Sequence, residues 1–338
     1  MKFGTLVRVR ASLVVTLALT GVVAAAVPAH AATPRAAAAP TQVSLVAGVN
    51  DTRDPTIAVL EFLPAKVKVA TGTTVTWSFA GPEMHSVTFV PPGTQVPPST
   101  QSDPSLFLPK PASGPYDGTT LVNSGLLPAG NASAVQKFSM SFGKTGTYTY
   151  YCVLHPNMVG AITVTDHTQD SQQKITKTGN QQKTQYLKEG EAAKHELTSA
   201  RSKSTKNSDG TTTYTVEMGA STAHTDVLAF SPTPRNVKAG DHVTFVNDSA
   251  APHTASFGGP LVPTISIADN VVHAVPGPSP QTLAQNTYFN TGWLPPMTKQ
   301  GPLLPATSYT YTVPAPGKWT YACVLHLPSG MAGEIDAR

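Results

Sequence analysis

The chain of 338 residues is longer than one ordinary domain, and its length predicts two units that each bury a core of their own. Hydrophobic residues make up 40% of it and charged residues only 12%, while 31 Pro and 26 Gly favour many turns and short strands over long helices. The formal net charge of +4 is small for this length and argues against a nucleic-acid partner.

The first 31 residues have the pattern of an export signal. Basic residues precede the apolar run SLVVTLALTGVVAAAV, and small residues surround a cleavage site after Ala31. The alternative is a membrane anchor, but the apolar run is shorter than the about 20 residues that cross a bilayer. We therefore expect a signal peptide at 1–31, a disordered linker at 32–41, and a mature chain without a membrane span that is secreted, periplasmic or held at the cell envelope.

Two parts of the chain repeat one another. LEFLPAKVKVATGTTVTWSFAGPEMH, which begins at Leu60, aligns without gaps on LAFSPTPRNVKAGDHVTFVNDSAAPH, which begins at Leu228. Farther along, GTYTYYCVLH at Gly146 corresponds to GKWTYACVLH at Gly317. A repeat of this length predicts that one structural unit occurs twice.

The hydrophobic pattern within each unit is typical of short strands. Val67, Val69, Val75 and Trp77 alternate with polar residues on either side of a turn at 71–72, which predicts a β-hairpin, and the second unit repeats the arrangement. Short closing strands are expected after each Cys, at AITV and GEI. Several short strands with polar turns predict an all-β chain of two tandem Greek-key β-sandwiches.

A polar, Lys-rich stretch separates the two units. Within it Tyr186, Leu187, Ala193 and Leu197 recur at near-helical spacing, so a short helix in a solvated connector is expected. The predicted organisation is a first sandwich at 42–166, a polar linker with a possible helix at 167–210, and a second sandwich at 211–338.

Each unit contains a single Cys, which is followed on the same short loop by a His and a Met. The loops are CVLHPNM, which begins at Cys152, and CVLHLPSGM, which begins at Cys323. A copper ion that cycles between two oxidation states needs soft sulfur for its reduced form and imidazole for its oxidised form. A trigonal set of two His and one Cys with a weak axial Met supplies both.

The remaining ligand of each set is expected from a His at the end of the second repeated strand, in EMHSVTF and APHTASF. A β-sandwich brings that strand end beside the Cys loop. Ser86 and Thr254, which follow these histidines, are expected to hydrogen-bond the adjacent loop or the Cys sulfur. The predicted metal ligands are His85, Cys152, His155 and Met158 in the first unit, and His253, Cys323, His326 and Met331 in the second.

These residues allow two other interpretations. The two cysteines could form a disulfide, although equivalent positions of two separate domains rarely approach to the roughly 6 Å that a disulfide needs. Zinc also accepts Cys and His, but a structural zinc site more often has two or more Cys and gains nothing from Met. The remaining histidines of the mature chain form no spaced metal motif; they are His167, His195, His224, His242 and His273.

On these loops both units resemble the cupredoxins, the small blue-copper proteins. Two residues separate His155 from Met158, as in the amicyanin pattern, and four separate His326 from Met331, as in plastocyanin and pseudoazurin. The resemblance implies one type 1 copper ion per unit and outer-sphere one-electron transfer to a redox partner protein through the exposed edges of His155 and His326. The long insertions before each Cys and the duplication depart from the family pattern.

Multicopper oxidases and copper nitrite reductases share the fold and are the enzymatic alternative. They need further copper ions held by His-x-His pairs and by a His beside the Cys, and neither Cys152 nor Cys323 has a neighbouring His. Copper sequestration or delivery is a third possibility, but storage proteins use clusters of Met or His, and the chain contains only 7 Met. The sequence therefore favours an exported electron carrier with no catalytic residues.

Overall fold

The computed structural model describes most of the chain between the predicted linker and the C-terminus. The expected signal peptide and the expected disordered linker lie outside the described residues, as do parts of the long insertions before each Cys. The described residues are 42–94, 104–128, 135–155, 157–200, 203–258, 265–268, 271–274, 281–284, 287–292, 294 and 308–338.

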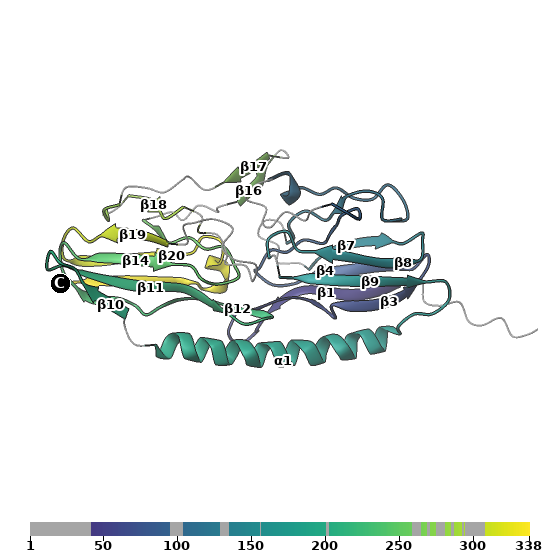
Figure 1. Ribbon diagram of the computed structural model, residues 1–338, viewed down its shortest axis with the longest axis horizontal. Helices are drawn as coiled ribbons and strands as arrows, with labels where there is room; N and C mark the ends of the chain where they lie inside the picture. Colours follow the sequence, from purple (N-terminus) through teal and green to yellow (C-terminus); the bar gives the residue numbers. More distant parts are fainter. Residues whose placement is uncertain are drawn as a thin grey trace, which may run out of the picture. The chain divides into compact units, whose positions relative to one another are not determined.

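A single sheet runs through both halves of the chain (Figure 1). Among the described residues it has nine strands in the order β19-β14-β11-β12-β2-β1-β4-β7, with β10 paired to β11. Its strands are β1 (Gln42–Asn50), β2 (Ile57–Leu63), β4 (Thr74–Phe79), β7 (Gln136–Ser141), β10 (Lys203–Lys206), β11 (Thr212–Ser221), β12 (Thr225–Ser231), β14 (His242–Val246) and β19 (Ser308–Thr312).

Two smaller sheets each complete a sandwich with one half of the large sheet. The first has the order β3-β9-β8-β5-β6 and the second β13-β21-β20-β15-β18, so the two halves correspond strand for strand. Their strands are β3 (Lys66–Ala70), β5 (Thr88–Phe89), β6 (Val122–Asn123), β8 (Gly146–Tyr151), β9 (Val159–Thr165), β13 (Arg235–Val237), β15 (Ser256–Phe257), β18 (Phe289–Asn290), β20 (Gly317–Ala322) and β21 (Ala332–Ala337). The other elements are β16 (Ile265–Ala268), β17 (Val271–Ala274) and the 3₁₀ turns η2 (Pro104–Phe107) and η3 (Leu327–Ser329).

Each sandwich has a hydrophobic core built around three rings. In the first core Trp77 lies edge-on to Tyr150 at 5.3 Å and to Phe89 at 5.9 Å between ring centroids. In the second core the same positions of the repeat hold Phe245, Tyr321 and Phe257, with centroid distances of 4.9 and 5.9 Å. Edge-to-face pairs of this kind add to the burial energy of the rings. The predicted pair of tandem β-sandwiches is confirmed.

The predicted hairpin at the turn 71–72 is wrong. β3 and β4 lie in different sheets: β3 pairs in parallel with β9, and β4 pairs in parallel with β1, with Leu45 opposite Trp77. The alternation of Val67, Val69, Val75 and Trp77 is real, because all four side chains are buried in one core. Alternation reports which face of a strand is buried, not which strand lies beside it.

The two sandwiches are joined through equivalent strands. β12 pairs antiparallel with β2, with Asp226 opposite Ala58. The repeat places Ala58 and Asp226 at the same position of the two units, so the contact is self-complementary, as at a twofold axis between two identical subunits. The boundaries of the sandwiches at 166/167 and 210/211 stay predictions.

A pair of matching hydrogen bonds continues this symmetry. Leu60 N donates to His224 O at 2.9 Å, and Leu228 N donates to Thr56 O at 2.7 Å. Leu60 and Leu228 are equivalent in the repeat, and so are Thr56 and His224. The backbone of each half thus makes the same contact with the other half, which places the two strand ends side by side.

The linker forms one long helix, α1 (Gln172–Ser199), that contacts β1, β2, β11 and β12 (Figure 1). Ser171 caps it by accepting a hydrogen bond from Lys174 N. The predicted helix is confirmed, but it is longer than expected and is not a solvated connector, because Ile175, Gly179, Gly190 and Leu197 are buried. Two of these are glycines, which contribute little to a hydrophobic pattern. Among the described residues no helix is long and apolar enough to cross a membrane.

We expect Gly190→Ala to lower the free energy of unfolding by about 1 kcal/mol, the net of an overpacking cost near 1–3 kcal/mol and a helix-propensity gain near 1 kcal/mol. A Cβ at this position would lie 2.5 Å from Thr225 Cγ2 and overlap Ile57 Cγ2, and both residues are buried on the strands that join the sandwiches. Urea unfolding measures the effect. The control is Asn180→Ala at an exposed helix position, which we expect to be neutral or stabilising. Equal stabilisation by both changes would contradict the prediction.

Candidate metal centres

The structure brings together a His, a Cys and a second His in each half. One ligand atom from each of His85, Cys152 and His155 lies within 4.8 Å of the others. The same holds for the second half, with His253, Cys323 and His326. All six side chains are buried. Within the described part of the chain these are the two groups of this kind.

The strand histidines and the Cys loops are positioned by backbone hydrogen bonds. His85 pairs with Leu127 through two backbone bonds, and His253 pairs with Leu294 in the same way. Each Cys follows the last residue of a core strand, β8 or β20. The predicted ligands of each site therefore come from two backbone segments that the sandwich holds in place, one with the strand His and one with the Cys loop.

Each Cys loop closes on itself, so that the Met returns beside the Cys. Cys152 N donates to Met158 O at 3.0 Å and Cys323 N donates to Met331 O at 3.0 Å. The second loop accommodates its two extra residues in η3, which ends at Gly330 with a left-handed backbone. Both methionine side chains are fully buried. Their role as axial ligands stays a prediction.

The donor atoms converge through Nδ1 of the histidines. In the second site Nδ1 of His253 and Nδ1 of His326 are 3.0 Å apart, and Cys323 Sγ lies 3.8 and 3.3 Å from them. In the first site Cys152 Sγ lies 3.5 Å from Nδ1 of His155. Nδ1 of His85 is buried and has no hydrogen-bond partner among the described residues. A thiol sulfur and two imidazole nitrogens that face one another suit a copper ion.

Burial keeps the strand histidines in the form that binds metal. It lowers the pKa of His85 and of His253 well below the ordinary value, and the neighbouring histidines add to the effect. Both imidazoles are thus neutral near neutral pH. The two thiols differ: burial raises the pKa of Cys152, whereas at Cys323 the charge of His326 and its hydrogen bond outweigh burial and lower the pKa.

Ser86 and Thr254 hold the Cys loops as predicted. The backbone N of Ser86 donates to Cys152 Sγ at 3.4 Å, and its hydroxyl accepts a hydrogen bond from Val153 N at 2.9 Å. Thr254 makes the same two contacts in the second site, to the sulfur at 3.4 Å and from Val324 N at 3.1 Å. The expectation that these residues contact the loop or the sulfur is confirmed.

Two glycines that sequence reasoning missed make room for the strand histidines. Gly48 lies at a β-bulge in β1 with φ +66°, and Gly219 lies at the equivalent bulge in β11 with φ +97°. A Cβ on Gly48 would overlap the His85 ring, and a Cβ on Gly219 would lie 3.0 Å from His253 Nε2. The sequence signal that could have indicated these bulges is a glycine within a strand at the same place of both repeats.

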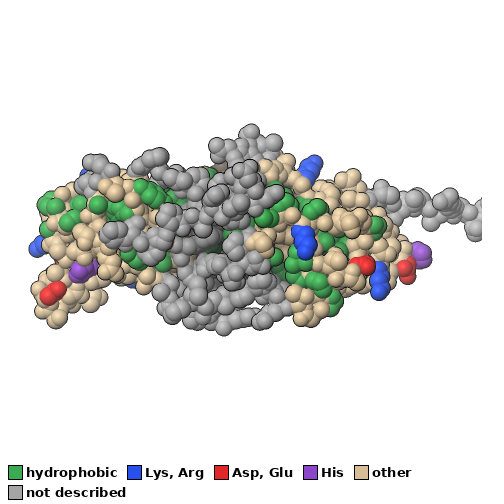
Figure 2. All heavy atoms as spheres, turned by 90° about the horizontal axis from the view of Figure 1, so that it is seen from above, with side chains coloured by type: hydrophobic (Ala, Val, Ile, Leu, Met, Phe, Trp, Pro, Cys, Tyr) green, Lys and Arg blue, Asp and Glu red, His purple; other side chains and the backbone are tan. Residues whose placement is uncertain are grey.

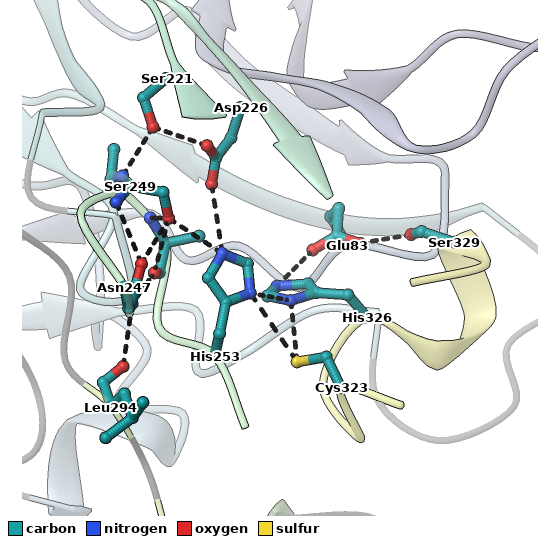
Figure 3. Close-up of polar contacts among 12 residues, drawn as sticks. Glu83, Ser221, Asp226, Asn247, Ser249, His253, Leu294, Cys323, His326 and Ser329 are labelled. Atoms are coloured by element: carbon teal, nitrogen blue, oxygen red, sulfur yellow. Dashed lines mark hydrogen bonds and ion pairs between the residues drawn. The ribbon is translucent and has the colours of Figure 1, made fainter. Parts of the chain in front are cut away.

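The loop histidines are not exposed, which corrects the expectation drawn from the resemblance. His155 and His326 are each only 2% exposed. His155 borders a small pocket with Thr222 and His224 of the second half, and His326 Nε2 lies 3.2 Å from Glu83 Oε2 of the first half (Figure 3). Each half of the chain covers the ring edge that an isolated sandwich would expose.

The second site is surrounded by two buried carboxyl groups that sequence reasoning also missed. Glu83 binds His326, and Asp226 Oδ2 lies 3.9 Å from Nε2 of His253, which also contacts Ser249 Oγ at 2.9 Å (Figure 3). At Glu83 burial acts to raise the pKa, but the charge of His326 and its hydrogen bond lower it below the ordinary value. At Asp226 burial prevails and raises the pKa to about 7.

The disulfide alternative is wrong, because both cysteines are free and buried. Each sulfur instead contacts the His of its own loop. Two other histidines have partners elsewhere: His224 Nδ1 lies 2.8 Å from Glu61 Oε1, and His242 Nδ1 lies 3.1 Å from Thr312 Oγ1.

Residues 51–165 match the family model described as copper binding proteins of the plastocyanin/azurin family. This part of the chain is similar to the cupredoxins, the family of plastocyanin and azurin. The matched residues include the first His-Cys-His group, and the smaller sheets of the two halves correspond strand for strand. The family and the two His-Cys-His groups together support copper binding.

The known relatives match little more than a third of this chain. Plastocyanin of Scenedesmus fuscus is 28% identical over 124 residues, which are 37% of this chain and 98% of that protein. Chloroplastic plastocyanin of Tetradesmus obliquus is 28% identical over 120 residues, 36% of this chain and 63% of that protein, so the chain spans less than two thirds of its length. An oxidised amicyanin variant of known structure is 20% identical over 38% of this chain and 88% of that chain, with a TM-score of 0.24.

Proposed function

We propose that this protein is a cupredoxin that carries one electron at a time, with two type 1 copper ions, one in each half. The observation that carries the proposal is the convergence of one thiol and two imidazole nitrogens in a buried pocket, twice, at equivalent positions of a repeat. Met158 and Met331 would supply a weak thioether ligand to each ion. The copper ion, when bound, supplies a centre that accepts and releases one electron.

The protein's own groups keep the site from rearranging. Backbone hydrogen bonds hold each strand His and each Cys loop, and both would hold the ion within a packed core, so neither can move without disturbing the sandwich. Backbone N–H groups of Ser86 and Thr254 donate to the sulfur atoms and tune the thiolate. Burial of all six His and Cys side chains excludes water from the ion. Small structural change and little solvent are what rapid electron transfer requires.

The partner of this carrier is a redox protein outside the cytoplasm. The export pattern at 1–31 supports this location. Of the described side chains on the face shown in Figure 2, few are charged, and these are scattered rather than gathered into a patch. On this face the described residues favour a largely uncharged contact, in which affinity does not depend on strong electrostatic attraction.

The proposal is tested by adding copper(II) to the purified apoprotein. We expect two copper ions per chain and an intense visible band from thiolate-to-copper charge transfer, which a mild reductant bleaches reversibly. Preferential, colourless binding of copper(I) would instead indicate sequestration or delivery. Turnover of oxygen or nitrite would indicate an enzyme, and a preference for zinc or a stoichiometry of zero would overturn the copper assignment.

A further inference from the structure

Glu83 belongs to the first half of the chain but acts on the metal site of the second. It lies two residues before His85, yet its Oε2 is 3.2 Å from His326 Nε2 and its Oε1 accepts a hydrogen bond from Ser329 Oγ (Figure 3). The side chains of Glu83 and His326 are 4% and 2% exposed. A buried carboxylate is thus held against the outer nitrogen of a predicted copper ligand by two contacts across the junction of the sandwiches.

The first site has no counterpart of this contact. In the repeat the position of Glu83 is occupied by Ala251, which has no carboxylate to offer His155. Nε2 of His155 is buried and without a hydrogen-bond partner among the described residues, so the charge of Glu83 acts on His155 only through space. The second carboxyl near the second site, Asp226, is likewise matched by an apolar residue, Ala58. The two halves therefore share the predicted ligands but differ in the carboxyl groups next to them.

The effect of Glu83 on the second site depends on how the His326 ring is oriented. Nδ1 of His326 faces Cys323 and His253, so a copper ion binds there and Nε2 carries the proton. An N–H that donates to a carboxylate makes its imidazole a stronger donor to the metal. The charge acts in a buried place, where its interaction with the ion is little screened. Both effects stabilise copper(II) relative to copper(I) and so lower the reduction potential.

We propose that Glu83 makes the second copper centre the lower-potential member of an internal redox pair, so that an electron held by the molecule resides on the first centre. The exchange is balanced within the chain: copper(I) at the second centre becomes copper(II) while copper(II) at the first becomes copper(I), and no proton is needed. The inference rests on the proposed function. It gives Glu83 the role of a positioning residue that acts through His326.

The potentials of the two centres test the proposal. Cys152→Ser and Cys323→Ser leave one centre each, so a spectroscopic redox titration assigns each potential to its site. We expect the second centre to have the lower value, and Glu83→Gln to raise it while the first centre moves much less. Glu61→Gln is the charge-matched control, because Glu61 is also a buried carboxylate and binds His224 of the other half. We expect it to leave the potential of the second centre unchanged.

Several outcomes would overturn the inference. Equal potentials in the unmodified sites, or a higher potential at the second, would do so without any Glu83 variant, which guards against a variant that fails to fold. An equal shift of both centres by Glu83→Gln, or a shift as large with Glu61→Gln, would show a general effect of charge rather than the contact with His326. A chain that binds two coloured copper ions with equal potentials contradicts this inference alone, whereas a chain that binds none contradicts the proposed function.

Discussion

Gly48→Ala is expected to abolish copper binding in the first site while the second site keeps its ion and its colour. The new Cβ would overlap Nε2 and Cδ2 of the His85 ring and lie 2.6 Å from Cε1. His85 cannot retreat, because its backbone is paired with Leu127 and the ring is buried. The ring must turn, and Nδ1 then leaves the position that faces Cys152. Copper stoichiometry and the visible spectrum measure the loss.

Gly72→Ala is the matched control for this change. Gly72 also has a left-handed backbone, with φ +83°, but a Cβ there would have no atom within 4 Å. Both variants carry the backbone strain of about 1–2 kcal/mol that a side chain causes in this region. Only Gly48→Ala meets a ligand. If both variants kept two copper ions, or if both lost the first, the glycine at the bulge would not be what admits the His85 ring.

The two His-Cys-His groups could be predicted from the sequence because they repeat. A Cys, a His and a Met on one loop, with a distant His on a strand, recur in both halves, and the structure brings His85, Cys152 and His155 together as that pattern requires. The contacts of Ser86 followed from its place beside His85. Such predictions depend on short-range pattern and on the general architecture of a sandwich, both of which the sequence carries directly.

What could not be predicted depends on how the two halves meet. The pairing of β2 with β12 brings Glu83 to His326 and places the turn before β12 over His155. A resemblance to single-domain cupredoxins implies exposed histidine edges because those proteins have no second half to cover them. The length of α1 and its buried face could not be predicted either, because Gly179 and Gly190 pack against the sheet without adding to a hydrophobic pattern.

Cys152→Ser is expected to leave one copper ion per chain and only the absorption band of the second centre, and Cys323→Ser is expected to leave only that of the first. A serine hydroxyl stays protonated near neutral pH and supplies neither the soft donor nor the charge-transfer band of a thiolate. Absorption spectra and copper analysis of the two variants measure this, each variant serving as the other's control.

This prediction requires that each site bind its ion independently, although Glu83 of the first half contacts His326 of the second site. The His-Cys-His group of each site comes from one half of the chain, and Glu83 contacts the outer nitrogen of His326 rather than supplying an atom to the ion. Its removal should therefore change the potential of the second centre and not its occupancy, and emptying the first site should leave the second ion bound. Loss of both ions from Cys152→Ser would mean that the two pockets form only when both are filled, and the chain would then be one binuclear unit rather than two carriers that share an interface.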